Sequence, residues 1–118
     1  MTRCDLSLGF VGLGALGLPM AINLQRAGFR LRVHSRSRTA ETHPKLEGAA
    51  RCSSPAEASN GVDVLLLCVS DDGAVEEVLF GVEGAASQLS AGSVVLDCST
   101  IAPATAQHCA ERLARQNV

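Results

Sequence analysis

The stretch Leu8-Gly-Phe-Val-Gly-Leu-Gly-Ala-Leu-Gly-Leu-Pro-Met20 joins an apolar strand pattern to an amphipathic helix pattern through three glycines. Each of these glycines has a separate expected role. Gly12 permits the tight turn that leaves the strand, Gly14 lets a phosphate approach the backbone, and Gly17 lets the helix pack closely on the strand. The N–H groups and the positive dipole end of the helix would then face the phosphates. This spacing predicts a dinucleotide-binding turn.

Strand-like and helix-like segments alternate along the 118 residues, which is typical of a parallel α/β sheet. We expect a Rossmann-type, doubly wound parallel sheet in three αβα layers, folded as a single domain over residues 1–118. The first strand should be central, with the second and third on one side. The apolar patterns of 62–69 and 93–96 predict buried strands. The other expected strands are 6–11, 30–34 and 49–52; the expected helices are 15–27, 55–59, 72–80 and 103–115, with a polar, irregular segment at 35–47.

Composition and charge exclude several classes of protein. Apolar residues make up 47% of the chain and aromatic residues only 3%, so the core must be aliphatic. A net charge of -2 and a pI near 5.9 argue against a general nucleic-acid or membrane-surface binder. No apolar run approaches the roughly 20 residues of a membrane span, and we see no signal-peptide pattern. We therefore expect a cytoplasmic protein, or one of the mitochondrial matrix if the parent is eukaryotic.

The cysteine and histidine patterns indicate no metal or disulfide chemistry. No cysteine pair has C-x-x-C spacing, and Cys68 and Cys98 lie in apolar strand patterns, where cysteine behaves as a small hydrophobe. We expect reduced, non-catalytic thiols. The three histidines share no ligand spacing, so we predict no metal site. The five cysteines are Cys4, Cys52, Cys68, Cys98 and Cys109.

Polar or glycine-rich loops follow four of the expected strands, at 12–17, 34–38, 69–73 and 97–101. In an open α/β sheet, ligands bind at the carboxyl ends of the strands near the point where the strand order reverses. These four loops should meet there. Their shared chemistry favours a nucleotide site over a purely structural domain.

The loop after the second strand bears on the choice of cofactor. A NAD site usually places an acid about 20 residues beyond the glycines, where it binds the ribose 2′-OH. This chain has Ser35-Arg36-Ser37 instead. Arg36 could bind a 2′-phosphate through its guanidinium, and the two serines add hydroxyl donors. The loop favours NADP, with NAD possible; the alternative is that its arginines only solvate a polar surface.

The loop at 69–73 could pass beneath the nicotinamide ribose, with the backbones of Val69 and Ser70 as contacts. The alternative is structural, because Ser70 or Asp71 would also cap the following helix. Neither Asp71 nor Asp72 has a further feature that suggests acid–base catalysis.

The run Asp97-Cys-Ser-Thr100 offers hydroxyl and backbone N–H groups after a predicted strand. Ser99 and Thr100 could hold a carboxylate or the nicotinamide end of a cofactor. The alternatives are that this run only enters the next helix, or that Asp97 anchors the loop by accepting backbone donors.

The stretch from Phe10 to Leu24, Phe-Val-Gly-Leu-Gly-Ala-Leu-Gly-Leu-Pro-Met-Ala-Ile-Asn-Leu, resembles the N-terminal signature of the β-hydroxyacid dehydrogenases. This family includes 3-hydroxyisobutyrate dehydrogenase, tartronate semialdehyde reductase and 6-phosphogluconate dehydrogenase. Ser35-Arg36-Ser37 resembles its Asn-Arg-Thr/Ser element, and residues 97–100 are similar to its D-x-S-T motif. Leu16 replaces the family's usual methionine, a volume-conserving change. The resemblance covers nearly the whole chain.

The resemblance implies a set of binding residues. Those expected to contact the nicotinamide dinucleotide are Gly12, Leu13, Gly14, Ala15, Leu16, Gly17, Ser35, Arg36, Ser37, Val69, Ser70 and Thr100; those expected to contact substrate are Ser99 and Thr100.

The resemblance also implies reversible NAD(P)-linked oxidation of a small β-hydroxyacid. In the family, a lysine on a later helical domain is the general acid/base, and a Ser-Gly-Gly loop helps to hold the substrate. This chain has no Ser-Gly-Gly, and its only lysine, Lys45, lies in the wrong motif context. We expect the cofactor-binding part of a dehydrogenase without the C-terminal helical catalytic domain, inactive alone and with no catalytic residue of its own. An uncovered sheet edge should make it a homo-oligomer, such as a dimer.

Two other interpretations stay open. The chain could be a stand-alone module that senses NAD(P) or regulates a partner without catalysis. It could also be a structural remnant of a Rossmann fold that binds nothing.

Overall fold

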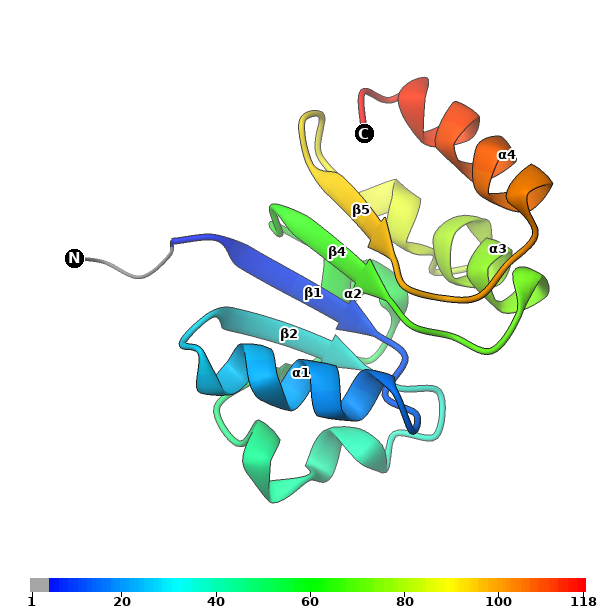
Figure 1. Ribbon diagram of the computed structural model, residues 1–118. Coiled ribbons are helices and arrows are strands. Elements are labelled where there is room, and N and C mark those ends of the chain that lie inside the picture. The colour runs from blue at the N-terminus through cyan, green and yellow to red at the C-terminus, as the bar shows by residue number, and fades with distance from the viewer. Residues whose placement is uncertain (1–4) are drawn as a thin grey trace.

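The computed structural model describes residues 5–118, and its centre is one five-stranded parallel sheet (Figure 1). The strand order is β3-β2-β1-β4-β5, which confirms the predicted topology with the first strand central. The strands are β1 (Ser7–Val11), β2 (Arg30–His34), β3 (Ala50–Arg51), β4 (Val64–Leu67) and β5 (Val94–Asp97). The helices are α1 (Gly17–Arg26), α2 (Pro55–Ser59), α3 (Asp72–Phe80) and α4 (Pro103–Ala114), with 3-10 turns η1 (Ala40–Thr42), η2 (Pro44–Leu46) and η3 (Ala85–Gln88).

Two aliphatic cores lie on opposite faces of the sheet, which gives the predicted three layers. Along β4, Leu65 and Leu67 belong to one core and Leu66 to the other, because successive side chains of a strand point to opposite faces. The first core includes side chains of α2, α3 and α4, and the second includes α1 and η2 (Figure 1). The strand predicted at 62–69 is therefore covered on both faces, although it is shorter than predicted.

The predicted strand at 93–96 is present as β5, but the prediction that it is buried was wrong. Strand β5 forms the edge of the sheet, and Val94 and Leu96 are 54% and 50% exposed. Val95, which points to the opposite face, packs against the core that contains Cys109 and Leu113 of α4. One face of β5 thus lies against α4, and the other presents apolar side chains to solvent.

Helix α1 begins two residues later than predicted. Residues 14–16 form the turn rather than the first helical residues, and the helix starts at Gly17. Its end agrees with the expected glycine stop: Gly28 has a φ of 96°, a left-handed conformation that favours glycine. Residues 12–16 therefore form a loop at the carboxyl end of β1, between the strand and the helix.

Asp72 links the starts of α3 and α4. Its carboxylate accepts hydrogen bonds from the Ala102 N–H at 3.2 Å and from the Thr105 hydroxyl at 2.6 Å. Helix α4 has no capping side chain of its own at Ala102, so Asp72 supplies the acceptor from another helix. The hydrogen bond from Thr105 lowers the pKa of the Asp72 carboxyl below its usual value. This link fixes the loop between β5 and α4 relative to α3.

Candidate functional site

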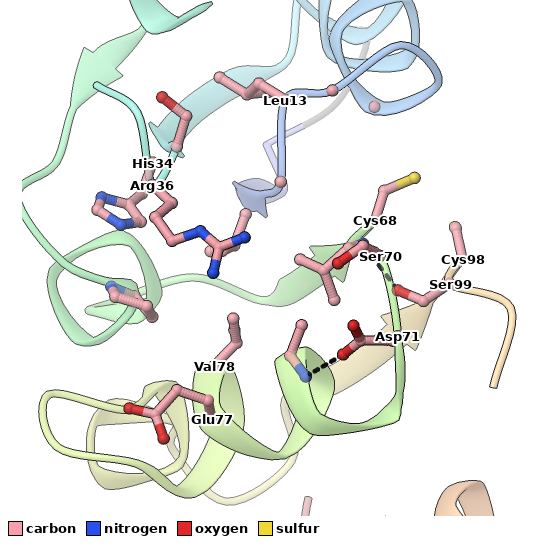
Figure 2. Close-up of a pocket in the computed structure, with 18 of the residues that line it drawn as sticks. Leu13, His34, Arg36, Cys68, Ser70, Asp71, Glu77, Val78, Cys98 and Ser99 are labelled. Atoms are coloured by element: carbon pink, nitrogen blue, oxygen red, sulfur yellow. Dashed lines mark hydrogen bonds between the residues drawn. The ribbon is translucent and has the colours of Figure 1, made fainter. Parts of the chain in front are cut away.

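A cavity of about 830 Å³ lies at the carboxyl edge of the sheet, and all four predicted loops line it (Figure 2). This volume is in the range of small-molecule and cofactor sites. The structure brings together every residue that the sequence assigned to cofactor or substrate. The lining includes Gly12, Leu13, Gly14, Ala15, Leu16, Gly17, Ser35, Arg36, Ser37, Val69, Ser70, Ser99 and Thr100.

The three glycines of the turn have different surroundings. Gly12 has a φ of 103°, and a Cβ added there would collide with the Cys68 carbonyl oxygen. A Cβ at Gly17 would collide with the Gly12 carbonyl oxygen. A Cβ at Gly14 would meet no atom within 4 Å. Gly12 and Gly17 therefore permit close backbone packing, whereas Gly14 leaves open a cradle that a side chain would fill. Such a cradle fits a pyrophosphate.

The N-terminal end of α1 leaves backbone donors for a ligand. The residue at its start, Leu16, provides no side-chain cap, and the first turn contains no acid. Among the described residues, the Leu18 N–H donates to the Gly14 carbonyl at 3.0 Å and the Met20 N–H donates to the Leu16 carbonyl at 3.4 Å. Because the positive end of the helix dipole also lies here, the turn suits an anion.

Arg36 is the free cation of the loop after β2. Its side chain extends into the cavity (Figure 2), and it makes no hydrogen bond or ion pair with residues 5–118. Arg38, by contrast, forms an ion pair with Glu41. Arg36 is thus available to an anionic ligand.

The two serines of this loop differ in what they offer. Ser37 is exposed, and its hydroxyl accepts a hydrogen bond from the Thr39 N–H at 3.3 Å. The Ser35 hydroxyl oxygen is buried and has no partner among the described residues. Ser35 nevertheless belongs to the cavity lining.

At the other end of the cavity, Ser99 joins two loops. Its hydroxyl accepts a hydrogen bond from the Val69 N–H at 2.9 Å (Figure 2), and its own N–H donates to the Asp97 carboxylate at 2.9 Å. Asp97 thus anchors the loop, as one of the alternatives proposed. The Ser99 hydroxyl proton is still free to donate, and Thr100 is exposed beside it.

Asp71 has the structural role that the sequence allowed as an alternative. Its carboxylate accepts the Ala74 N–H at 2.8 Å and caps α3 (Figure 2). Ser70 is exposed on the cavity lining beside it.

The cavity also includes residues that the sequence reasoning did not assign. His34 follows the β2 pattern, and its Nδ1 lies 2.9 Å from the Cys52 carbonyl oxygen; a carbonyl only accepts, so Nδ1 carries the proton. His34, Cys68 and Cys98 share one feature that the sequence could have used: each lies where a strand meets its loop, at the carboxyl edge of the sheet. Pro55, Val78 and Val82 come from α2, α3 and the segment after it, and no local pattern indicates that they line a cavity.

The thiols and candidate metal ligands of the described residues can be placed directly. Cys52, Cys68, Cys98 and Cys109 are free thiols, and Cys4 lies outside the described residues. Burial raises the pKa of the Cys68 thiol, which keeps it protonated in the cavity wall. Within residues 5–118, no three His, Cys, Asp or Glu side chains are grouped so that they could hold a metal ion. No helix in this range is long and apolar enough to cross a membrane.

Residues 7–118 match the protein family described as the NAD binding domain of 6-phosphogluconate dehydrogenase. The chain belongs to this family. The match agrees with the resemblance seen in the glycine turn, and the fold and the open cradle at Gly14 fit an NAD(P)-binding domain of the β-hydroxyacid dehydrogenase type.

Among similar proteins, 2-hydroxy-3-oxopropionate reductase of Escherichia coli K12 is 39% identical over 98 residues, which are 83% of this chain. The crystal structure of 3-hydroxyisobutyrate dehydrogenase from Salmonella typhimurium has a TM-score of 0.87 against this fold, with 34% identity over 96% of this chain. The solved structure titled Psf3 in complex with NADP+ and 2-OPP has a TM-score of 0.85 and 30% identity over 93% of this chain.

This chain spans only part of these proteins. It covers 33% of the Escherichia coli reductase and 39% of each of the two solved structures.

The different surroundings of the glycines predict opposite outcomes for two alanine substitutions. Gly14→Ala should leave the free energy of unfolding within about 1 kcal/mol of the original, because its methyl group meets open space. It should weaken dinucleotide binding about tenfold or more, because the methyl group occupies the phosphate cradle. Gly17→Ala should destabilise the fold by about 1–3 kcal/mol or more, because its methyl group overlaps the Gly12 carbonyl.

Urea unfolding and dinucleotide titration of both variants measure this difference. A Gly14→Ala variant that binds as tightly as the original chain would contradict the cradle.

Proposed function

We propose that this chain is the NADP-preferring cofactor-binding domain of an oxidoreductase that acts on the CH–OH group of a small β-hydroxyacid. The observation that carries the proposal is the cavity with an open cradle at Gly14 and an unpaired guanidinium at Arg36. The membership of the NAD-binding family supports the cofactor class.

The preference for NADP is supported by the charges around the loop after β2. A site for NAD needs a carboxylate that can accept from the ribose 2′-OH. The nearest acid of this loop, Glu41, is buried and already bound to Arg38 and to the Ser35 N–H. Arg36 lies on the cavity instead, where it could bind a 2′-phosphate. The similar structure titled as a complex with NADP+ is consistent with this choice.

Within this proposal, the residues of the chain bind and orient. The backbone of 12–17 holds the pyrophosphate, Arg36 the 2′-phosphate, and the backbones of Val69 and Ser70 the nicotinamide ribose. The cofactor supplies a nicotinamide C4 that accepts or returns a hydride. The Ser99 hydroxyl proton and Thr100 are placed to hold the nicotinamide end or a substrate carboxylate.

The catalytic acid/base and most substrate contacts would belong to other parts of a full-length parent. Lys45, the only lysine of the chain, lies on η2 and is not part of the cavity lining. The two acids that do line the cavity are Asp71, which caps α3, and Glu77. We therefore propose that the chain alone is inactive.

We also propose that the protein works in the cytoplasm, or in the mitochondrial matrix of a eukaryotic parent.

The same observation on Lys45 favours a second candidate. A cavity with cofactor-binding groups but no lysine suits a stand-alone module that senses NAD(P) and regulates a partner without catalysis. The two candidates share the cofactor site and differ in turnover.

Arg36→Ala should weaken NADPH binding by about 1–3 kcal/mol more than NADH binding, because only NADPH loses a charged hydrogen bond. Isothermal titration of both cofactors measures the difference. Arg115→Ala, at the exposed end of α4 and outside the cavity lining, is the matched control and should change neither affinity. An equal loss for both cofactors would rule out contact with the 2′-phosphate, and no saturable binding by the original chain would leave only a structural remnant.

Turnover of small β-hydroxyacids with NADP+ should be undetectable for this chain, because the cavity holds no lysine. The formation of NADPH absorbance is the measurement. Activity that survives Lys45→Ala would require a different catalytic group and would overturn the proposed inactivity.

We also propose that the chain forms a homo-oligomer through the β5 edge. Among residues 5–118, no strand pairs with the outer side of β5, and Val94 and Leu96 are half exposed. Two copies related by a two-fold axis can pair such edges and cover each other's apolar side chains. Light scattering should give a mass above that of one chain, and Leu96→Lys should shift it toward the monomer. A clean monomer for the unmodified chain would contradict this proposal.

A further inference from the structure

Glu41 is a buried carboxylate beneath the loop that carries Arg36. Its side chain is 0% exposed. One oxygen accepts the Ser35 N–H at 3.1 Å. The other forms an ion pair with the Arg38 guanidinium and lies 3.5 Å from Nη2 of Arg51. A buried carboxylate requires such compensation, so the contacts hold all four residues in one arrangement.

These contacts fix a four-residue turn at both ends. The Arg38 N–H donates to the Ser35 carbonyl at 3.2 Å, so Arg36 and Ser37 are the central residues of the turn. Arg38 has a φ of 63°, a conformation rare for residues other than glycine. Arg51 donates to the Arg38 carbonyl at 3.3 Å. The Glu41 carboxylate therefore binds the backbone N–H of the first turn residue, Ser35, and the side chain of the last, Arg38.

The same contacts divide the three arginine side chains near the turn into two that lie against Glu41 and one that does not. Arg38 and Arg51 lie against Glu41, with side chains 41% and 49% exposed, and neither lines the cavity. Arg36 has no carboxylate partner among the described residues and extends into the cavity (Figure 2). The Glu41 carboxylate thus pairs with Arg38 and Arg51, and Arg36 is left available to a ligand.

We infer that Glu41 is a positioning residue that sets the selectivity for NADPH over NADH. It acts through Arg36, by fixing the turn that presents this guanidinium and by holding Arg38 and Arg51 away from the cavity. The pyrophosphate is assigned to the backbone of 12–17, and NADH has no 2′-phosphate for Arg36 to bind, so we expect NADH binding to depend on this arrangement much less than NADPH binding does. The inference rests on the proposed NADP preference.

The variant Glu41→Gln keeps an acceptor for the Ser35 N–H but removes the charge that holds the two guanidinium groups. NADPH should bind about tenfold more weakly, the size of one lost charged hydrogen bond. NADH affinity should stay within about twofold, because NADH has no 2′-phosphate. A structural defect of the whole cavity would instead weaken both cofactors alike.

Isothermal titration of NADPH and NADH against the original chain, Glu41→Gln, Arg36→Ala and the double variant tests the inference. If Glu41 acts through Arg36, then Glu41→Gln should cause no further loss of NADPH affinity once Arg36 is alanine. An unchanged NADPH/NADH ratio in Glu41→Gln would overturn the inference, and so would an additive loss in the double variant.

Two further outcomes are distinguishable. If the original chain binds NADPH and NADH equally, the proposed NADP preference fails and the inference fails with it. If the original chain prefers NADPH and Arg36→Ala abolishes the preference, the proposed function stands and only the Glu41 variants decide the inference.

A second variant covers the case in which Glu41→Gln fails to fold, shown by the loss of its thermal transition. Arg51→Gln changes a half-exposed side chain that contacts both Glu41 and the Arg38 carbonyl. It should lower the NADPH/NADH preference by about two- to threefold, less than the loss of the charge itself. An unchanged preference in a folded Arg51→Gln would then overturn the inference.

Discussion

The close packing of backbone on backbone between the turn after β1 and the start of α1 is the constraint on which the rest of the site depends. The carbonyl of Cys68 lies against Gly12, and the carbonyl of Gly12 lies against Gly17. Because no side chain separates these segments, the start of α1 is held at the edge of the central strand. Gly14 is left facing the cavity. This end of the cavity is thus built by the main chain.

Side chains near the cavity act mainly on the loops. Ser99 binds the Val69 backbone, Asp71 caps α3, and Glu41 binds the turn after β2. Each holds one loop through a backbone N–H. Such contacts let polar loops keep one conformation with few apolar contacts of their own, which is the preorganisation that a ligand site needs. Arg36 is the contrast, since its charge is not used to hold the fold.

The sequence was a good guide where a local pattern decides the structure. The bounds of β2 and α3, the strand order and the close packing at Gly12 and Gly17 were all predicted, because periodicity, caps and turn residues act over a few positions. The exposure of Leu96 could not be read in this way, since an apolar strand pattern is the same at an edge as at the centre of a sheet. The contact of Asp72 with Ala102 and the burial of Glu41 depend on distant parts of the chain.

The link between α3 and α4 has a mechanical consequence. Asp72 binds the first turn of α4, and the loop that ends there includes Ser99 and Thr100. The helix then runs for 12 residues, or about 18 Å. The far end of the helix is held as well, because the Gly92 N–H donates to the Asn117 carbonyl at 2.8 Å and the Gln116 side chain donates to the Ala86 carbonyl at 2.7 Å. With both ends fixed, α4 acts as a brace that ties the 97–101 loop at the cavity rim to the segment before β5.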